Sequence, residues 1–526
     1  MSGARLWHNG RVFTGRRFAE AILIDDGRVV SVGTTAQVRR SAPTGTESED
    51  LGGHLIIPGL IDAHLHLARV TLTRESLDIG PARSLGELIA RSRDWAVRHP
   101  VGTVVGHGWR ADQFDHDAVP SRTELDEAVP DRPFVIYHSS GHAVVVNSPA
   151  LARIGIDRAT PDPRGGRIGR DPEGQPSGVL YESAIRSVEP VVSEVSQVDP
   201  EALLRTLESL AAFGLTTVAS MNVGAGEAGA LRRLRDDQRL PIRVRLYTHL
   251  EAIRDHTRAD FDAYSDPEYL AVTGIKGFTD GAFGPRTAWL SAPYADAPDQ
   301  VGLPAENDAE LADALQSAAA LGLAPALHAI GDRAVQRALK LLRTSVGATA
   351  APPRIEHAAL TPPELFPHLE DVGPALVVQP GFVWSDHWLA ERLGRERARW
   401  AYAFRSLTDR GLLLAGSSDA PYDPVDPWRG LQACVARRDP EGRSANPETA
   451  EAVPVEEALQ MYTVNGGRVL GEPELGLLEA GGRADLSILD TADLGEAFRR
   501  GAAGIRETRV GGEVVAAGKP AIAANG

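Results

Sequence analysis

The stretch "GLIDAHLHL", from Gly59 to Leu67, is an apolar run that ends in two histidines. Successive side chains of a β-strand point to opposite faces, so we expect His64 and His66 on the same face. Imidazole is a common ligand of zinc and of similar divalent metals. An isolated pair of this kind is more often explained by surface or core packing than by a metal. Other residues of the chain are needed to tell whether these two histidines bind a common metal.

A helix-like stretch followed by an apolar strand recurs through most of the chain. In "DPEALLRTLESLAAFGLTTVASM", residues 199–221, Asp199 can cap a helix, Pro200 suits its first turn and Gly214 ends it. The eight apolar strands that we predict are "LIDAHLHL", "TTVASM", "VRLYTHL", "IKGFTDG", "LAPALHAIGD", "PRIEHAAL", "PALVVQPG" and "LLLAGSSDAP". Eight strands close a parallel barrel, so the sequence predicts an α/β fold with a (β/α)8 TIM-like barrel.

Short strands with turn signals are predicted near both ends of the chain. Asn9-Gly10 and Asp26-Gly27 are typical of hairpin turns. The C-terminal segments "LGLLEAGGRADLSILD" and "TRVGGEVVAAG" have the same character. We therefore predict one composite β-sandwich built from residues 1–57 and 472–526.

The barrel itself is predicted to span residues 58–471. Its first two strands are separated by an insertion at about residues 68–198, which contains strands of its own, "TVVGHGW" and "FVIYHSSG". An insertion at this point leaves from the C-terminal end of a barrel strand, where the active sites of such barrels lie. We expect it to cover the mouth of the active site.

Composition excludes several classes of partner. A formal net charge of -16 argues against a nucleic-acid ligand, which requires clustered Lys and Arg. No apolar run is long enough for a membrane helix, and the N-terminal stretch has no signal-peptide pattern. The only cysteine, Cys434, cannot form an internal disulfide. We expect a cytoplasmic protein with a small-molecule substrate; the oligomeric state stays open, with a homodimer the commonest arrangement.

Polar side chains with metal-ligand chemistry lie at the ends of five of the predicted strands. They are His64, His66, Lys276, His328, His357 and Asp419. Taken singly, each has an ordinary explanation, such as a hydrogen bond to a loop, an ion pair or a helix cap. Their joint occurrence in strand order favours a metal centre at the C-terminal end of the barrel.

The same residues carry a resemblance to a known family. The segments "PGLIDAHLHL", "IKGFTDGAFGPRTAWL", "LHAIGDRAV", "RIEHA", "GSSDAP" and "LGLLEAGGRADLSILD" look like those of the amidohydrolase superfamily. The similarity is to the amidohydrolase-3 branch, which includes N-substituted formamide deformylases, and it spans nearly the whole chain. The resemblance implies a distorted (β/α)8 barrel, a flanking β-sandwich and one or two divalent metals, with zinc expected and manganese and iron left open.

Residue by residue, the resemblance implies a ligand set. His64, His66, His328 and His357 match the family's histidine ligands, and Asp419 matches the eighth-strand aspartate. Lys276 matches the fourth-strand lysine that bridges two metals when carbon dioxide carboxylates it.

The resemblance and the residue types also suggest contacts to substrate. The insertion carries "HSSGHAVVVNSPAL", similar to a segment of the branch, so His142 and Asn147 are expected to reach the substrate. Ser140 stands where aspartate is common, which weakens that expectation. Trp109 and Arg286 complete the predicted substrate-binding set, together with an apolar pocket that Trp289 and Trp384 could line. Asp280, Arg286 and Asp332 also fit the role of loop anchors or partners of the ligands.

The predicted chemistry is hydrolysis of a C–N bond in an amide, a formamide or another N-acyl compound. Divalent metal lowers the pKa of bound water, so hydroxide becomes available near neutral pH. Asp419 is then the general base that takes a proton during attack and the general acid that passes it to the leaving amine. Two alternatives stay open: a metal-dependent hydrolase of an ester, lactone or cyclic imide, and a barrel that binds a ligand without catalysis.

Overall fold

The computed structural model describes residues 3–109, 114, 119–138, 143–163, 166–192, 198–345 and 349–518. The chain forms two compact units. One contains residues 1–67 and 204–526, and the other contains residues 68–203.

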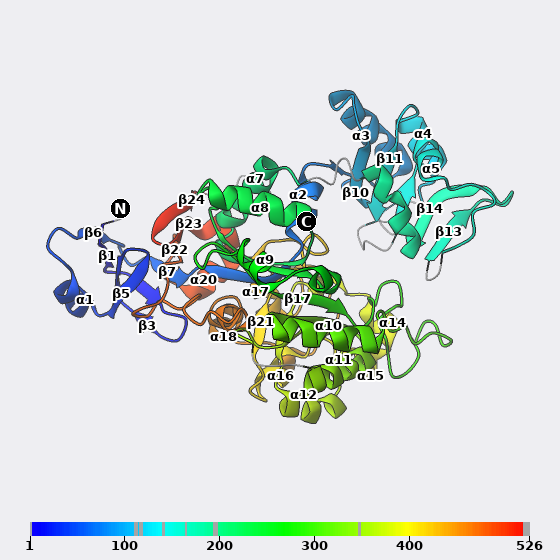
Figure 1. The fold of residues 1–526 in the computed structure, drawn as a ribbon. Coiled ribbons are helices and arrows are strands. Elements are labelled where there is room, and N and C mark those ends of the chain that lie inside the picture. The colour runs from blue at the N-terminus through cyan, green and yellow to red at the C-terminus, as the bar shows by residue number, and fades with distance from the viewer. Residues whose placement is uncertain are drawn as a thin grey trace. The chain divides into compact units, whose positions relative to one another are not determined.

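Eight parallel strands in the first unit form the predicted barrel sheet (Figure 1). In chain order they are β8 (Leu60–Leu65), β15 (Leu215–Val223), β16 (Arg243–His249), β17 (Leu270–Phe278), β18 (Ala324–Ala329), β19 (Arg354–His357), β20 (Ala375–Val378) and β21 (Leu414–Gly416). Each strand pairs with the next one along the chain, from β8 to β21. Both the predicted strands and the predicted fold class are therefore confirmed.

The two ends of this sheet meet at the C-terminal end of the barrel. No strand pair joins β8 and β21, both of which the structure describes in full. Two backbone hydrogen bonds join them instead, just after β21: Asp419 N donates to the His64 carbonyl at 2.8 Å, and His66 N donates to the Ala420 carbonyl at 2.9 Å. The first strand is thereby held against the segment that follows the last strand.

Helices connect the barrel strands or follow the last of them. The longer ones are α7 (Pro200–Ala212), α8 (Ala225–Asp236), α10 (Asp308–Ala320), α11 (Asp332–Ser345) and α17 (Pro427–Ala436). Shorter ones are α9 (Arg258–Asp262), α12 (Phe366–Val372), α13 (Phe382–Ser385), α14 (Leu389–Leu393), α15 (Arg395–Ala398), α16 (Phe404–Thr408), α18 (Val455–Met461) and α19 (Val464–Val469). Of these helices, α17, α18 and α19 follow the last strand. Helix α7 begins as predicted, because the Asp199 carboxylate accepts from the backbone N–H groups of Glu201 and Ala202.

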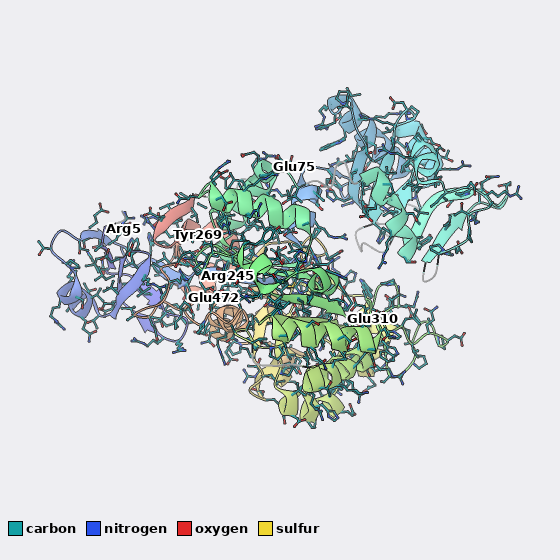
Figure 2. All side chains as sticks on the ribbon, in the orientation of Figure 1. Arg5, Glu75, Arg245, Tyr269, Glu310 and Glu472 are labelled. Atoms are coloured by element: carbon teal, nitrogen blue, oxygen red, sulfur yellow. The ribbon has the colours of Figure 1, made fainter. Side chains whose placement is uncertain are left out.

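The interior of the barrel is filled mainly by small and branched apolar side chains. They are Ile61, Ala63, Ala219, Met221, Tyr247, Ala326, Ala375, Val377 and Ala415, which pack in one cluster with side chains near α19. Alternation along each strand sends these residues inward. Figure 2 shows Arg245 of β16 beside Glu472, to which its Nη2 donates at 2.8 Å. The barrel interior is therefore a packed core, and a substrate site is expected at the strand ends.

Strands from both chain ends share a sheet. Its order is β24 (Glu513–Ala517), β23 (Ile505–Val510), β22 (Leu486–Leu489), β7 (Leu55–Pro58), β2 (Arg11–Phe13) and β3 (Phe18–Ala19). A second sheet contains β5 (Arg28–Gly33), β4 (Ala21–Asp25), β1 (Arg5–His8) and β6 (Glu47–Asp50), with helix α1 (Thr35–Ser41) beside it. Figure 1 shows the C-terminal strands beside β7. Side chains of the two sheets, including Trp7, Ile56 and Ile488, pack in one buried cluster.

The two predicted turns differ in what they connect. Asp26 and Gly27 both have positive φ angles and join β4 to β5 as a two-residue hairpin, as expected. Asn9 also has a positive φ, of 53°, but β1 and β2 on either side of it belong to different sheets. The Asn9-Gly10 signal therefore marks the point where the chain crosses from one sheet to the other, and the prediction of a hairpin there is wrong.

The second unit has its own mixed sheet. Its strands lie in the order β13 (Gly166–Arg170), β14 (Pro176–Glu182), β12 (Ala143–Val146), β11 (Phe134–His138), β10 (Val104–Trp109) and β9 (Leu77–Asp78). Helices of this region are α2 (Leu67–Arg74), α3 (Leu85–Arg98), α4 (Arg122–Ala128), α5 (Ser148–Ile154) and α6 (Glu189–Val192). The two strands predicted in the insertion are β10 and β11, which pair in parallel. No helix among the described residues is long and apolar enough to cross a membrane.

Candidate metal centre

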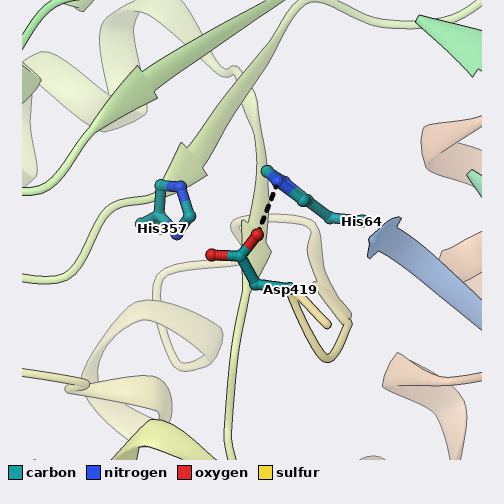
Figure 3. Close-up of side chains that lie close together, drawn as sticks. All are labelled: His64, His357 and Asp419. Atoms are coloured by element: carbon teal, nitrogen blue, oxygen red, sulfur yellow. Dashed lines mark ion pairs between the residues drawn. The ribbon is translucent and has the colours of Figure 1, made fainter. Parts of the chain in front are cut away.

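Three ligand-type side chains from distant parts of the chain meet at the C-terminal end of the barrel (Figure 3). His64 lies near the end of β8, His357 is the last residue of β19, and Asp419 follows β21. One ligand atom from each of the three lies within 4.8 Å of the others, and all three residues are buried. His64 Nε2 and His66 Nε2 each lie 3.2 Å from Asp419 Oδ1.

The remaining predicted ligands lie beside this group. The His328 ring is 4.5 Å from the His357 ring between centroids, in an edge-to-face arrangement. Lys276 is 1% exposed and lies on β17, the strand next to the one that carries His328. Its amine lies 5.1 Å from the centre of the Phe278 ring, which in turn lies 5.3 Å from the His328 ring. The structure thus gathers all six predicted residues in one region.

Hydrogen bonds fix which nitrogen of each buried imidazole carries the proton. His64 Nδ1 lies 2.5 Å from a Glu356 carboxylate oxygen, and His357 Nδ1 lies 2.6 Å from the Gln379 amide oxygen. His328 Nε2 lies 2.9 Å from the Gly281 carbonyl oxygen. Each of these oxygens is an acceptor, so each contacted nitrogen is the donor. In the neutral form of each ring, the other nitrogen keeps a lone pair.

The donor set at this centre fits a divalent cation. His64 Nε2 and Asp419 Oδ1 are both buried, and among the described residues neither has a hydrogen-bond partner. An imidazole lone pair and a carboxylate oxygen that face each other at 3.2 Å are two acceptors, which a cation between them would satisfy. Second partners that orient each ligand, here Glu356 and Gln379, are typical of histidine metal sites.

Burial shifts the pKa values of the groups at this centre. It lowers the pKa of His66 to about 4, against the opposing effect of Asp419. It also lowers the pKa of Lys276 to about 8, although Glu356 and Asp419 oppose this. Burial alone would raise the pKa of Asp419, but His64 and His66 hold it well below its usual range. His66 and His357, whose pKa burial also lowers, are therefore neutral and Asp419 is anionic near neutral pH, as ligands must be.

Asp62 is a further structural residue of the centre, and sequence analysis did not identify it. Its carboxylate accepts from the backbone N–H groups of His64 and Ser418, both at 3.1 Å, and from the Ser418 hydroxyl at 2.6 Å. It therefore holds the end of β8 to the segment that carries Asp419. The aspartate in "LIDAH" was visible, but its partner lies more than 350 positions away in the chain.

The predicted role of Asp280 as a loop anchor agrees with its contacts. Its carboxylate accepts from the backbone N–H groups of Trp289 at 2.8 Å, Ile330 at 3.0 Å and Gly331 at 2.8 Å. Asp332 likewise accepts from Ser291 N. These bonds hold the loop between β17 and α10 against the connection that follows His328.

Arg286 has a partner within the same loop. Its guanidinium pairs with Asp296, with an Nη2–Oδ2 distance of 2.8 Å. The backbone of Arg286 has a φ of 60°, in the left-handed region. A contact between Arg286 and substrate stays a prediction.

The predicted substrate contacts in the insertion have structural roles or lie outside the described residues. Trp109 is 3% exposed, belongs to the core of its unit and packs edge-to-face on His138. Asn147 is fully buried, and its amide makes four hydrogen bonds, from Phe134 N and Ala150 N and to the Val129 and Arg132 carbonyls. That amide has no capacity left for a substrate. His142 lies outside the described residues, as does Ser140.

His249 and Glu306 form a second polar group near the centre that sequence analysis missed. His249 ends β16 and is in register with Lys276 on β17, so the two side chains project from the same face of the sheet. His249 Nε2 lies 4.0 Å from Glu306 Oε1, and Phe278 N donates to the other Glu306 oxygen at 3.1 Å. The His249 side chain is 33% exposed. A histidine at the end of the third predicted strand, "VRLYTHL", was the available signal.

Comparisons with known proteins cover almost the whole chain. Residues 47–519 match the model of the amidohydrolase family. The protein YtcJ of Bacillus subtilis (strain 168) is 33% identical over 502 residues, which cover 92% of this chain and 94% of YtcJ. The N-substituted formamide deformylase of Arthrobacter pascens is 31% identical over 493 residues, with 90% of each chain covered. A crystal structure of a metal-dependent hydrolase from Pyrococcus horikoshii OT3 superposes with a TM-score of 0.80 at 30% identity, covering 94% of this chain and 98% of that one.

Proposed function

Because this chain belongs to the amidohydrolase family, we propose that it is a metal-dependent enzyme that hydrolyses the C–N bond of a small amide, formamide or other N-acyl compound. The deformylase of Arthrobacter pascens acts on such a bond, as its name states, and its similarity covers 90% of this chain. The observation that carries the proposal is the pair of buried acceptors, His64 Nε2 and Asp419 Oδ1, which face each other at 3.2 Å without a hydrogen-bond partner in the described part of the chain.

The residues that would hold the metal are His64, His66, His328, His357 and Asp419, with Lys276 as a bridge when carboxylated. A divalent cation bound there supplies Lewis acidity, which polarises the substrate carbonyl and acidifies water. Zinc is the expected metal, because imidazole and carboxylate ligands suit it.

Asp419 is the residue that we expect to move protons. Its carboxylate is anionic near neutral pH and lies against two imidazoles at the open end of the barrel. It takes a proton from the attacking water as the C–O bond forms. It then delivers that proton to the nitrogen as the C–N bond breaks, so that an amine and a carboxylic acid leave. His249, on the same face as Lys276, is the side chain that we expect to contact the substrate beside this centre.

The proposal is tested by metal content and activity measured on the same preparations. We expect one or two zinc ions per chain by elemental analysis and turnover of a panel of N-alkylformamides and N-acyl amines, each compared with its matched ester. His64→Ala and Asp419→Asn should lower kcat at least 100-fold. His368→Ala is the matched control, because His368 is exposed on α12.

Two results would count against this function. Full hydrolysis by protein stripped of metal would exclude a metal-dependent mechanism. A strong preference for the ester over its matched amide would shift the assignment to the ester-hydrolase alternative.

A further inference from the structure

An ion pair lies inside the barrel directly behind His64. Arg354 and Glu356 are two residues apart on β19, so both side chains project from the same face of the strand. Arg354 Nε and Nη2 donate to the two Glu356 carboxylate oxygens at 2.5 and 2.9 Å. The side chains of Arg354, Glu356 and His64 are all 0% exposed. The pair is thus a bidentate salt bridge in the core of the molecule.

This ion pair contacts the first barrel strand at two points. The Glu356 oxygen that accepts from Arg354 Nη2 is also the one that lies 2.5 Å from His64 Nδ1. The same Arg354 Nη2 donates to the Ala63 carbonyl, next to His64 in the chain, at 2.6 Å. The Arg354 guanidinium lies 4.6 Å from the centre of the Tyr247 ring. Both the imidazole of His64 and the backbone before it are therefore held.

Stability of the fold does not explain why charges occupy this position. Burying two charges costs so much desolvation free energy that a buried ion pair is often no more stabilising than well-packed apolar residues of similar volume. Tyr247 and Ala63, which lie beside this pair, belong to the apolar cluster that fills the barrel. An apolar pair at positions 354 and 356 would suit that surrounding at least as well. The contact of Glu356 with His64 offers another explanation, in which the ion pair positions the histidine.

We propose that Arg354 and Glu356 are positioning residues that hold His64 in a single tautomer, with its Nε2 lone pair facing Asp419, and so set the affinity of the centre for its metal. This inference rests on the proposed function. The Glu356 carboxylate accepts from His64 Nδ1, and the two hydrogen bonds from Arg354 hold that carboxylate in place. The partner of His357 at the same centre is a neutral amide, Gln379, so of these two ligands His64 is the one whose Nδ1 meets a carboxylate.

The chain contains a matched ion pair remote from the metal ligands. Arg243 and Asp485 are each 1% exposed and form two hydrogen bonds, at 2.7 and 2.9 Å. Arg243 is the first residue of β16, so this pair lies at the N-terminal end of the barrel, opposite the metal centre. Asp485→Asn therefore breaks a buried bidentate pair of the same chemistry without touching His64.

The experiment measures zinc affinity by competition with a chromophoric chelator, and the melting temperature of the metal-free protein. Three variants of the full chain are compared with wild type: Glu356→Gln, the double variant Arg354→Met with Glu356→Leu, and Asp485→Asn. We expect Glu356→Gln to weaken zinc binding 10-fold to 100-fold, as is usual when the partner of a ligating histidine is lost. The double variant leaves no unpaired charge, so it should melt above Glu356→Gln yet bind zinc as weakly. Asp485→Asn should melt lower than wild type while binding zinc within about 2-fold of it.

Each outcome bears on the inference. Zinc binding of wild-type strength in the double variant would overturn it while leaving the proposed function intact. An equal loss of zinc affinity in Asp485→Asn would also overturn it, because general loosening would then explain the effect. If wild-type protein itself bound no zinc, the proposed function would fail and the inference with it. Should Glu356→Gln fail to fold, the double variant provides the same measurement.

Discussion

Two residues of the metal centre adopt a backbone conformation that their side chains disfavour. His357 has a φ of 71° and Asp419 a φ of 56°, both in the left-handed region that glycine prefers. Such conformations are maintained by the surrounding structure and cluster at functional sites. Here Asp419 N is held by the His64 carbonyl, so the strained residue is fixed by a neighbouring ligand. The geometry therefore favours ligand placement at the expense of local backbone stability.

Lys276 provides a prediction about metal stoichiometry. An ammonium group buried among metal ligands would repel cations, whereas a carboxylated lysine supplies two anionic oxygens. We expect Lys276→Ala to lower the zinc content by about one ion per chain and to abolish most activity. Lys340→Ala is the control, since Lys340 is exposed on α11. Equal zinc content in wild type and Lys276→Ala, measured by elemental analysis, would contradict a bridging role.

A buried carboxylate near the centre predicts a pH effect on stability. Burial raises the pKa of Asp423 to about 6, against the opposing effects of Arg429 and Ser385. The folded state therefore binds more protons than the unfolded state between about pH 4 and 6, so stability from this group is lost as pH rises through 6. Asparagine is neutral throughout, so the melting temperature of metal-free Asp423→Asn should rise relative to wild type as the pH rises from about 4 to 7. The change corresponds to about 3 kcal/mol at most; a difference independent of pH would refute it.

At this scale the sequence predicted polar residues that the structure brings together, but not the residues that hold them in place. His64, His66 and Asp419 could be recognised because each follows an apolar strand and belongs to a short motif. Glu356 and Gln379 could not, because their roles depend on which ring nitrogen they meet across neighbouring strands. Asn147 shows the opposite error. Its motif suggested a substrate contact, but backbone groups of its own unit take up all the hydrogen-bonding capacity of the Asn147 amide.

At the scale of elements, Asp280 is a main anchor of the loop between β17 and α10. Asp280 accepts three backbone hydrogen bonds, and an asparagine has only one acceptor oxygen. Asp280→Asn leaves at least one buried N–H unpaired, which costs about 1–3 kcal/mol. We expect a lower melting temperature and faster cleavage of this loop by trypsin.

A matched substitution in the same loop separates this effect from loss of charge. Asp299 is exposed, so Asp299→Asn should leave both the melting temperature and the rate of cleavage near those of wild type. Equal behaviour of the two variants would show that Asp280 does not anchor the loop.

The elements that sequence analysis predicted best are those with a local signature. The barrel strands are short apolar runs, and helix α7 has its cap and its terminating glycine in the sequence. Asn9-Gly10 was misread because a turn sequence specifies backbone geometry and not the partner of the next strand. Strand β2 pairs with β7, more than forty residues later, and that choice is made by packing.

At the scale of the whole molecule, the two chain ends depend on each other. Ile488 of β22 is 0% exposed and packs with Trp7, Val12 and Ile22 from the N-terminal segment. Ile488→Ala should lower the free energy of unfolding by about 2–5 kcal/mol, because it leaves a cavity between residues from both ends. Val514→Ala on the neighbouring hairpin is the control, since Val514 is 45% exposed. Urea unfolding that gave the same midpoint for both variants would argue against a shared core.

The contacts that complete the barrel have a consequence for how the molecule matures. The two main-chain hydrogen bonds between the ends of the strand ring run through His64, His66 and Asp419, the same residues that would grip a cation. Under the proposed function, a newly made chain gains its affinity for the ion only when these two ends of the sheet meet. An ion bound at that point would stabilise the closed barrel relative to chains in which the first and last strands have not yet met.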